Sequence, residues 1–331
     1  MPTVRTLLAV ATIRGWPLWK IYVNNAFLHG NLRETVFMKP PPGYVCPPNH
    51  VCHLHKSLYG LKQAPRAWFE IFPSAIIQAG FHQSPNDNSL FVKRTTRGST
   101  CLLLYVDDMI ITGNDVSGIT SLKTYLMRSF KMKDLGPLTY FLGLEISRSK
   151  AGVSIRQKKY AEDVLSLAHL TDSKLCDTPL ELKAKLRKDD GSPLPDPTMH
   201  RRLVGSLIYL TMTRPDVSHA VQIVSQFVSN PHKPHLAAVH RILCYIQGTM
   251  DRGLFYSSTS SLELRCYADA DWAGCQDTRR STTGWCMFLG SSLISWKCNK
   301  QPTVSKSSAE VENRSMSSAS SEVIWLRRFL L

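Results

Sequence analysis

The sequence predicts an α+β protein of two or three domains, since 331 residues are enough for several hydrophobic cores. Apolar residues recur at helical spacing in some segments and form short strand-like runs in others, and the two kinds alternate through the first half of the chain. A charged stretch rich in Pro and Asp, residues 183–199, is the expected linker, and three helical segments and a second αβ region follow it. The hydrophobic content of 43% is ordinary for a globular protein.

The first half of the chain opens with a helix over residues 3–14, where apolar side chains follow a helical spacing. The prolines of residues 40–48 predict a loop, and Pro65 can begin a helix that Pro73 should kink or split. The other elements expected here are strands at 21–28, 89–95 and 101–112, a helix at 117–130, and a strand pair at 140–146 and 152–157.

The second half is expected to contain helices near 200–212, 216–229 and 234–247. A strand that ends in acidic residues then begins at LELRCYADADWAG, two further strands follow, and a helix begins at about residue 307. That helix still carries apolar residues at the last positions of the sequence, so we expect both ends of the chain to be cut from a longer protein.

The balance of charge indicates a polyanionic partner. Lys and Arg number 40 against 25 Asp and Glu, which gives a formal net charge of +15. Each phosphate that such a surface neutralises releases counterions, which favours binding to nucleic acid. An inert basic surface is the alternative, and charge alone does not separate the two.

The cysteines and the hydropathy limit the class of protein further. Nine cysteines without C-x-x-C spacing favour reduced thiols in an intracellular protein over a disulfide framework, and HVCHLH lacks the second cluster that a zinc site needs. No apolar run approaches the length of about 18 to 20 residues that crosses a bilayer. We therefore expect a soluble, non-secreted protein that does not enter a membrane.

Two adjacent carboxylates lie between apolar runs in LLLYVDDMIITG. Asp107 and Asp108 are expected at the turn of a hairpin, where burial without a partner would be costly. Two divalent cations would neutralise them, as in the two-metal arrangement of phosphoryl transfer. The alternative is a solvated Asp-Asp turn.

Seven blocks in fixed order decide between these interpretations: KIYVNNAFLHG, SLYGLKQAPRAWFE, LLLYVDDMIITG, MKDLGPLTYFLGLEI, RRLVGSLIYLTMTRPD, DADWAG and DTRRSTTG. Together they closely resemble the reverse transcriptase and ribonuclease H of a copia-type retrotransposon Pol polyprotein, over essentially the whole chain. The resemblance implies a reverse-transcriptase palm of the ferredoxin-like split βαβ type with partial fingers at 1–150. It also implies a helical thumb or connection at 151–258 and a truncated α/β ribonuclease H-like domain at 259–331.

The resemblance also implies roles for individual residues. Asp107 and Asp108 match the carboxylates that bind the catalytic Mg²⁺ ions, with Mn²⁺ as an alternative metal. The residues that match the family's nucleotide and template contacts are Asn25, Ala26, Phe27, Gly60, Lys62, Gln63 and Arg66. Without the surrounding blocks, Phe27 would be read as a core aromatic, and Lys62 and Arg66 as a solvated basic face.

In the ribonuclease H-like region, Asp269 matches the first catalytic and metal-binding acid, and Asp271 is a weaker candidate. Glu312 fits the second such position better than Glu310, although acids are favoured in the first turn of any helix. The family's remaining acids lie beyond this helix, so ribonuclease activity is not expected.

One position departs from the family pattern, because Tyr22 stands where the third metal-binding aspartate is expected. A phenol with a pKa near 10 does not replace an anionic oxygen ligand for Mg²⁺ at neutral pH. The resemblance therefore implies a fragment of an RNA-directed DNA polymerase with impaired activity. Its substrates would be a primed RNA or DNA template and deoxynucleotides, and its location a cytoplasmic particle or the nucleus. The alternative is a catalytically inactive, basic nucleic-acid-binding remnant. The oligomeric state stays open.

Overall fold

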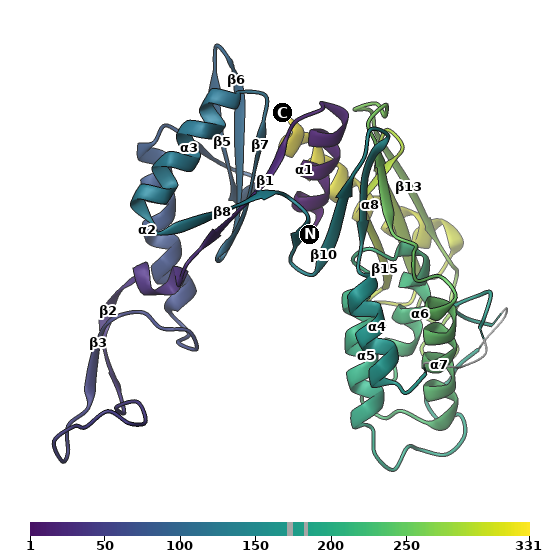
Figure 1. Ribbon diagram of the computed structural model, residues 1–331. Coiled ribbons are helices and arrows are strands. Elements are labelled where there is room, and N and C mark those ends of the chain that lie inside the picture. The colour runs from purple at the N-terminus through teal and green to yellow at the C-terminus, as the bar shows by residue number, and fades with distance from the viewer. Residues whose placement is uncertain (171–174, 182–184) are drawn as a thin grey trace. The chain divides into compact units, whose positions relative to one another are not determined.

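The computed structural model describes residues 1–170, 175–181 and 185–331 (Figure 1). These residues form two compact units. The sheet unit comprises residues 16–138, and the split unit comprises residues 1–15 together with 139–331. The mixed α/β content predicted from the sequence is confirmed. The units do not follow the three predicted segments, whose boundaries stay a prediction.

The sheet unit is built on a six-stranded antiparallel sheet in the order β4-β5-β6-β7-β1-β8. Two helices connect its strands, so that a helix follows β1 and another follows the β6–β7 hairpin. The elements are β1 (Leu18–Val23), η1 (Ala26–His29), β2 (Asn31–Met38), β3 (Cys52–Lys56), α2 (Ala64–Gln78), β4 (His82–Ser84), β5 (Asp87–Thr95), β6 (Gly98–Tyr105), β7 (Asp108–Gly113), α3 (Val116–Ser129) and β8 (Met132–Pro137).

Helices α2 and α3 cover one face of this sheet. Alternate residues of the strands point to that face, and they share one apolar core with both helices. The largest side chains of the core are aromatic, among them Trp68 and Phe72 of α2. Helix α2 continues past Pro73, so of the two predicted outcomes, a kink or a split, the split does not occur.

The strand expected over residues 21–28 is shorter than predicted and begins earlier. β1 ends at Val23, and the chain then turns into the 3-10 helix η1. Asn25 has a φ of 54°, a left-handed conformation that a strand does not accommodate and that asparagine tolerates better than most residues. The strand prediction was therefore correct only for residues 21–23.

The split unit contains two sheets and a cluster of helices. One sheet has the order β12-β11-β10-β9 and the other β13-β14-β15. The elements are α1 (Pro2–Ile13), β9 (Tyr140–Phe141), β10 (Leu144–Arg148), β11 (Gly152–Arg156), α4 (Lys158–Leu167), α5 (Thr198–Leu210), η2 (Pro215–Val217), α6 (Ser218–Ser225), α7 (Lys233–Gln247), β12 (Leu254–Ser257), β13 (Leu264–Ala270), β14 (Thr282–Leu289), β15 (Ser292–Lys300) and α8 (Ser308–Leu330).

Helices α4 to α7 share their own apolar core, and α1 packs on β11, β12 and β15. The predicted helices of this half are confirmed to within a few residues. Residues 185–197 of the predicted linker form no helix or strand, and residues 183 and 184 lie outside the described residues. No helix of the described chain is long and apolar enough to cross a membrane.

Candidate active site

The β6–β7 hairpin carries the two adjacent aspartates at its tip. Tyr105 pairs with Asp108, so Val106 and Asp107 form the turn. Val106 has a φ of 54°, an unusual conformation for a β-branched residue. Two hydrogen bonds hold the turn in place: Trp68 Nε1 donates to the Val106 carbonyl at 2.8 Å, and the Val23 amide donates to the Asp107 carbonyl at 2.8 Å. The sheet and helix α2 therefore fix the position of both carboxylates.

Strand β1 brings two further side chains to this turn. Tyr22 pairs directly with Asp108, so the two side chains project from the same face of the sheet. Lys20 is two residues earlier on that face, and its Nζ lies 2.9 Å from Asp108 Oδ1. The position that the resemblance assigns to a third carboxylate thus holds a phenol, and an ammonium group lies beside it.

The pKa values of two tyrosines near the turn are raised. Burial raises the pKa of Tyr22, and the Asp107 carboxylate, to which the phenol is hydrogen-bonded, raises it further. Burial likewise raises the pKa of Tyr59, and the charge of Asp107 adds to the effect. Both phenols are therefore neutral at physiological pH, and Asp107 has a neutral phenol beside it where a third anion was expected.

The predicted nucleotide contacts lie at the end of β1. Asn25 is exposed, whereas Ala26 and Phe27 are buried. The Phe27 ring packs against Tyr59, with 4.5 Å between the ring centroids, and belongs to the same core as Trp68. The structure thus gives Phe27 a core role, and the nucleotide contact implied by the resemblance stays a prediction.

The segment before α2 carries the other predicted contacts. Gly60 has a φ of 94°. Lys62 is exposed and makes no ion pair within the described chain, and Gln63 is the N-cap residue of α2 without a side-chain capping bond. Arg66 is also exposed, but its Nε lies 3.1 Å from Glu70 Oε1. Surface pairs of this kind are worth about 0 to 1 kcal/mol, so Arg66 can exchange Glu70 for a phosphate.

Gly60 is required for its conformation and not for lack of space, since a Cβ atom built on it meets nothing within 4 Å. We expect Gly60→Ala to destabilise the protein by about 1 to 2 kcal/mol, because the left-handed region is unfavourable for L-residues. Gly205 in α5 is the matched control: it also has open space around its Cβ position but no positive φ. Gly205→Ala should stabilise by about 1 kcal/mol. Urea denaturation of both variants measures the difference, and equal shifts would contradict the assignment.

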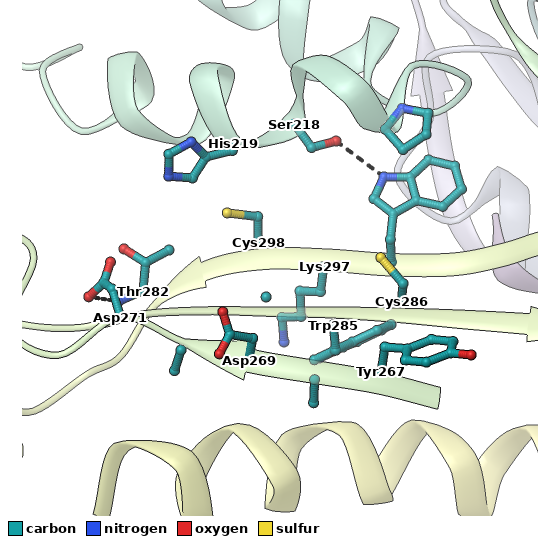
Figure 2. Close-up of a pocket in the computed structure, with 15 residues that line it drawn as sticks. Ser218, His219, Tyr267, Asp269, Asp271, Thr282, Trp285, Cys286, Lys297 and Cys298 are labelled. Atoms are coloured by element: carbon teal, nitrogen blue, oxygen red, sulfur yellow. Dashed lines mark hydrogen bonds between the residues drawn. The ribbon is translucent and has the colours of Figure 1, made fainter. Parts of the chain in front are cut away.

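The acidic residues of the second region lie on the sheet β13-β14-β15. Tyr267 pairs with Cys286, and Cys286 pairs with Trp296, whose Nε1 donates to Ser218 Oγ of α6. By alternation, Asp269 points to the same side of the sheet as Tyr267, toward α6. Figure 2 shows the resulting pocket, with the strands on one side and α6 on the other.

The pocket has a volume of about 460 Å³, and both Asp269 and Asp271 line it. The two carboxylates are used differently. Asp271 Oδ1 accepts hydrogen bonds from the amides of Gly274 and Thr282, at 3.1 and 3.0 Å, and so stabilises its own loop. The Asp269 carboxylate has no hydrogen bond or ion pair within the described chain. Asp269 is thus the more available of the two for binding a ligand.

The two candidate glutamates of α8 differ in the same way. Glu310 Oε2 accepts from the Lys306 amide at 2.8 Å, Oε1 lies 2.7 Å from Arg314 Nη2, and the N-cap Ser307 accepts from the Glu310 amide. Glu310 therefore stabilises the start of the helix. Glu312 has no such partner within the described residues.

Helix α8 brings Glu312 close to the backbone of Asp269. Ser315, three residues after Glu312 and therefore on the same side of the helix, donates to the Asp269 carbonyl oxygen at 2.9 Å. Glu312 thus lies about one helical turn from the backbone of Asp269. It does not line the pocket that contains the Asp269 carboxylate.

The donor set of the hairpin does not fit a pair of divalent cations. Mg²⁺ prefers anionic oxygen ligands in octahedral geometry. The hairpin offers Asp107 and Asp108, but Tyr22 is a neutral hydrogen-bond partner and Lys20 brings a positive charge to Asp108. Within the described residues, no three or more His, Cys, Asp or Glu side chains gather where they could hold a metal ion.

Three residues near the hairpin were not predicted from the sequence as site residues: Lys20, Tyr59 and Trp68. Lys20 and Tyr59 lie inside quoted motifs but reach Asp107 and Asp108 only through the pairing of β1 with β7 and the packing of the loop before α2. The spacing of Lys20 and Tyr22, two residues apart on one strand, was the available signal for Lys20.

Comparison with known proteins supports the family resemblance. A family model described as reverse transcriptase (RNA-dependent DNA polymerase) matches residues 1–182. The chain is 43% identical over 326 residues to the retrovirus-related Pol polyprotein from transposon RE1 of Arabidopsis thaliana, and the match covers 98% of this chain and 22% of that protein. Identity and coverage are the same for the Pol polyprotein from transposon RE2 of the same plant.

A third relative, the Pol polyprotein from transposon TNT 1-94 of Nicotiana tabacum, is 39% identical over 344 residues, which cover 100% of this chain and 26% of that protein. The chain thus spans between 22% and 26% of the length of these relatives. Reverse transcriptases generally use divalent metal ions, a template with its primer, and nucleotides. The family match and the three relatives show that the chain belongs to the reverse transcriptase family, as a fragment of a copia-type retrotransposon Pol polyprotein.

Proposed function

We propose that this chain is a primer–template-binding fragment of an RNA-directed DNA polymerase in which nucleotidyl transfer is severely reduced. The observation that carries the proposal is the contact of Tyr22 with the two adjacent aspartates. In the family, divalent ions supply the charge that stabilises the transferring phosphate. With Tyr22 in place of a carboxylate, Asp107 and Asp108 do not supply enough anionic ligands for that step.

The sheet unit corresponds in this proposal to the palm. Its helices alternate with strands as in a split βαβ arrangement, and the acidic hairpin lies in the middle of the sheet. Lys62 and Arg66 bind phosphates of the primer–template, and Phe27 supports the sugar of the nucleotide. The helical part of the split unit corresponds to the thumb or connection, and Asp269 and Glu312 belong to a ribonuclease H-like site.

Primer extension tests the proposal. On a primed RNA template with Mg²⁺ or Mn²⁺, we expect no measurable extension by the unmodified chain, and a gain by the Tyr22→Asp variant that Asp107→Asn abolishes. Fluorescence anisotropy should show binding of the same primer–template that weakens steeply with salt, because phosphate contacts release counterions. Robust extension by the unmodified chain would refute the loss of activity.

The alternative, a nucleic-acid-binding remnant without any latent activity, is favoured by the same Tyr22 contact. It predicts salt-sensitive binding but no gain of extension in Tyr22→Asp. A chain that fails to bind primer–template at low salt would contradict both proposals.

A further inference from the structure

Lys20 carries a positive charge directly to the acidic hairpin. Its Nζ lies 2.9 Å from Asp108 Oδ1, and the side chains of Lys20 and Asp108 are only 15% and 20% exposed. Charges on side chains with so little exposed surface interact more strongly than the charges of a fully exposed pair. The pair is therefore a structural part of the site and not a solvent-exposed contact.

The Lys20 ammonium lies beside the buried Oδ1 oxygen of the Asp108 carboxylate. Asp108 Oδ1 is buried and makes no geometrically good hydrogen bond within the described chain, so the nearby Lys20 ammonium is the positive charge that compensates it. A buried carboxylate without a counter-charge would be costly. Lys20 reaches this position because it is two residues from Tyr22 on β1, on the face that Tyr22 shares with Asp108.

The other carboxylate is satisfied from the same strand. The Tyr22 phenol hydrogen-bonds Asp107, so β1 provides one partner for each aspartate. A divalent cation that approached this turn would have to displace the Lys20 ammonium from Asp108 and break the phenol contact of Asp107. Both steps reduce its affinity, and the positive charge of Lys20 repels it besides.

We infer that Lys20 is the resident cation of the hairpin, and that Lys20 and Tyr22 together hold Asp108 and Asp107 in place of divalent metal ions. This inference rests on the proposed function in taking Tyr22 as the departure that reduces activity. It adds that Tyr22→Asp alone leaves the site partly blocked, because Lys20 still neutralises Asp108.

Binding of Mn²⁺ to the full chain, followed by electron paramagnetic resonance, tests the inference without any assay of activity. We expect no specific binding by the unmodified chain and weak binding by Tyr22→Asp. The Lys20→Gln/Tyr22→Asp variant should bind at least about tenfold more tightly than Tyr22→Asp, since removing a close positive charge favours the bound cation. Adding Asp107→Asn and Asp108→Asn to that variant should remove the binding.

Lys39 provides the control for charge. It follows β2, outside the β1–β7 pair, is exposed, and makes no ion pair within the described chain. Lys39→Gln/Tyr22→Asp should therefore bind Mn²⁺ like Tyr22→Asp. Lys20→Arg/Tyr22→Asp keeps the charge and should also bind like Tyr22→Asp. Lys20→Met is a second neutral variant if Lys20→Gln does not fold, as checked by circular dichroism.

The inference is overturned if Lys20→Gln/Tyr22→Asp binds Mn²⁺ no more tightly than Tyr22→Asp, or if the unmodified chain binds it as tightly as the double variant. An equal gain from Lys39→Gln would also overturn it. Primer–template binding in the presence of a chelator is measured on the same samples. If the samples do not bind primer–template but the variants still bind Mn²⁺ in the expected order, the proposed function alone is rejected.

Discussion

Replacing Trp68 by alanine is expected to destabilise the sheet unit by about 3 to 5 kcal/mol. Trp68 is 2% exposed, and its ring packs against both Phe72 and Phe130, with centroid distances of 5.3 and 5.6 Å. The substitution opens a cavity and also leaves the Val106 carbonyl without its hydrogen-bond donor. Urea denaturation of Trp68→Ala against the unmodified chain measures the loss.

Phe69 is the matched control, because it is the next residue of α2 and is 37% exposed. Phe69→Ala should cost much less than Trp68→Ala, since little buried volume is lost. A similar shift in both variants would contradict the view that Trp68 connects the core to the acidic turn.

Replacing Arg214 by methionine is expected to destabilise the split unit by about 1.5 to 3 kcal/mol, the usual range for hydrogen bonds that involve a charged group. Arg214 is 3% exposed and donates to Asp216 through Nε at 2.9 Å and Nη2 at 2.7 Å. It also donates to the Thr249 carbonyl and hydroxyl. After the substitution, Asp216 retains Tyr245 as a partner but loses its positive charge.

The pH dependence of this loss has a defined sign. Burial opposes ionisation of Asp216, but the hydrogen bonds and charge of Arg214 outweigh it and hold the pKa of Asp216 below its usual value of 3.8. A lowered folded-state pKa contributes stability above the unfolded pKa, and the contribution is lost as the pH falls through the folded pKa. The difference between the unmodified chain and Arg214→Met should therefore be largest near neutral pH and shrink below about pH 4.

Arg265 is a control of similar geometry, because its Nη2 lies 2.6 Å from Glu263 Oε2 with both side chains more than half exposed. Arg265→Met should leave the urea midpoint almost unchanged, since exposed pairs contribute little. A loss in Arg214→Met that is independent of pH between 3 and 7 would count against the role of Asp216.

The sequence predicted best those features that depend on local pattern. Helices α1, α3, α7 and α8 follow the apolar spacing closely, and the hairpin of Asp107 and Asp108 lies where two apolar runs meet. The prediction of a strand over residues 21–28 failed because a short apolar run indicates burial but does not fix the backbone conformation. The left-handed conformation of Asn25 does not fit a strand.

Features that depend on pairing between distant segments could not be read from the sequence. Lys20 and Asp108 are 88 positions apart, and only the register of β1 with β7 brings their strands together. The sequence likewise does not show that Asp271 is engaged by the amides of Gly274 and Thr282, whereas the Asp269 carboxylate is available to a ligand. The motifs identified the segments of the candidate site, and the fold determined which side chains in them are already occupied.

The place of α1 in the split unit has a consequence for synthesis. Residues 2–13 are synthesised before the rest of the split unit, and β15, on which the helix packs, ends only at Lys300. At about 5 to 20 residues per second, the helix waits on the order of 15 to 60 seconds for that partner. During this time its apolar residues, such as Leu7 and Leu8, lie open to solvent or to a chaperone. The split unit is therefore completed after the sheet unit, which has all of its strands once Pro137 has emerged.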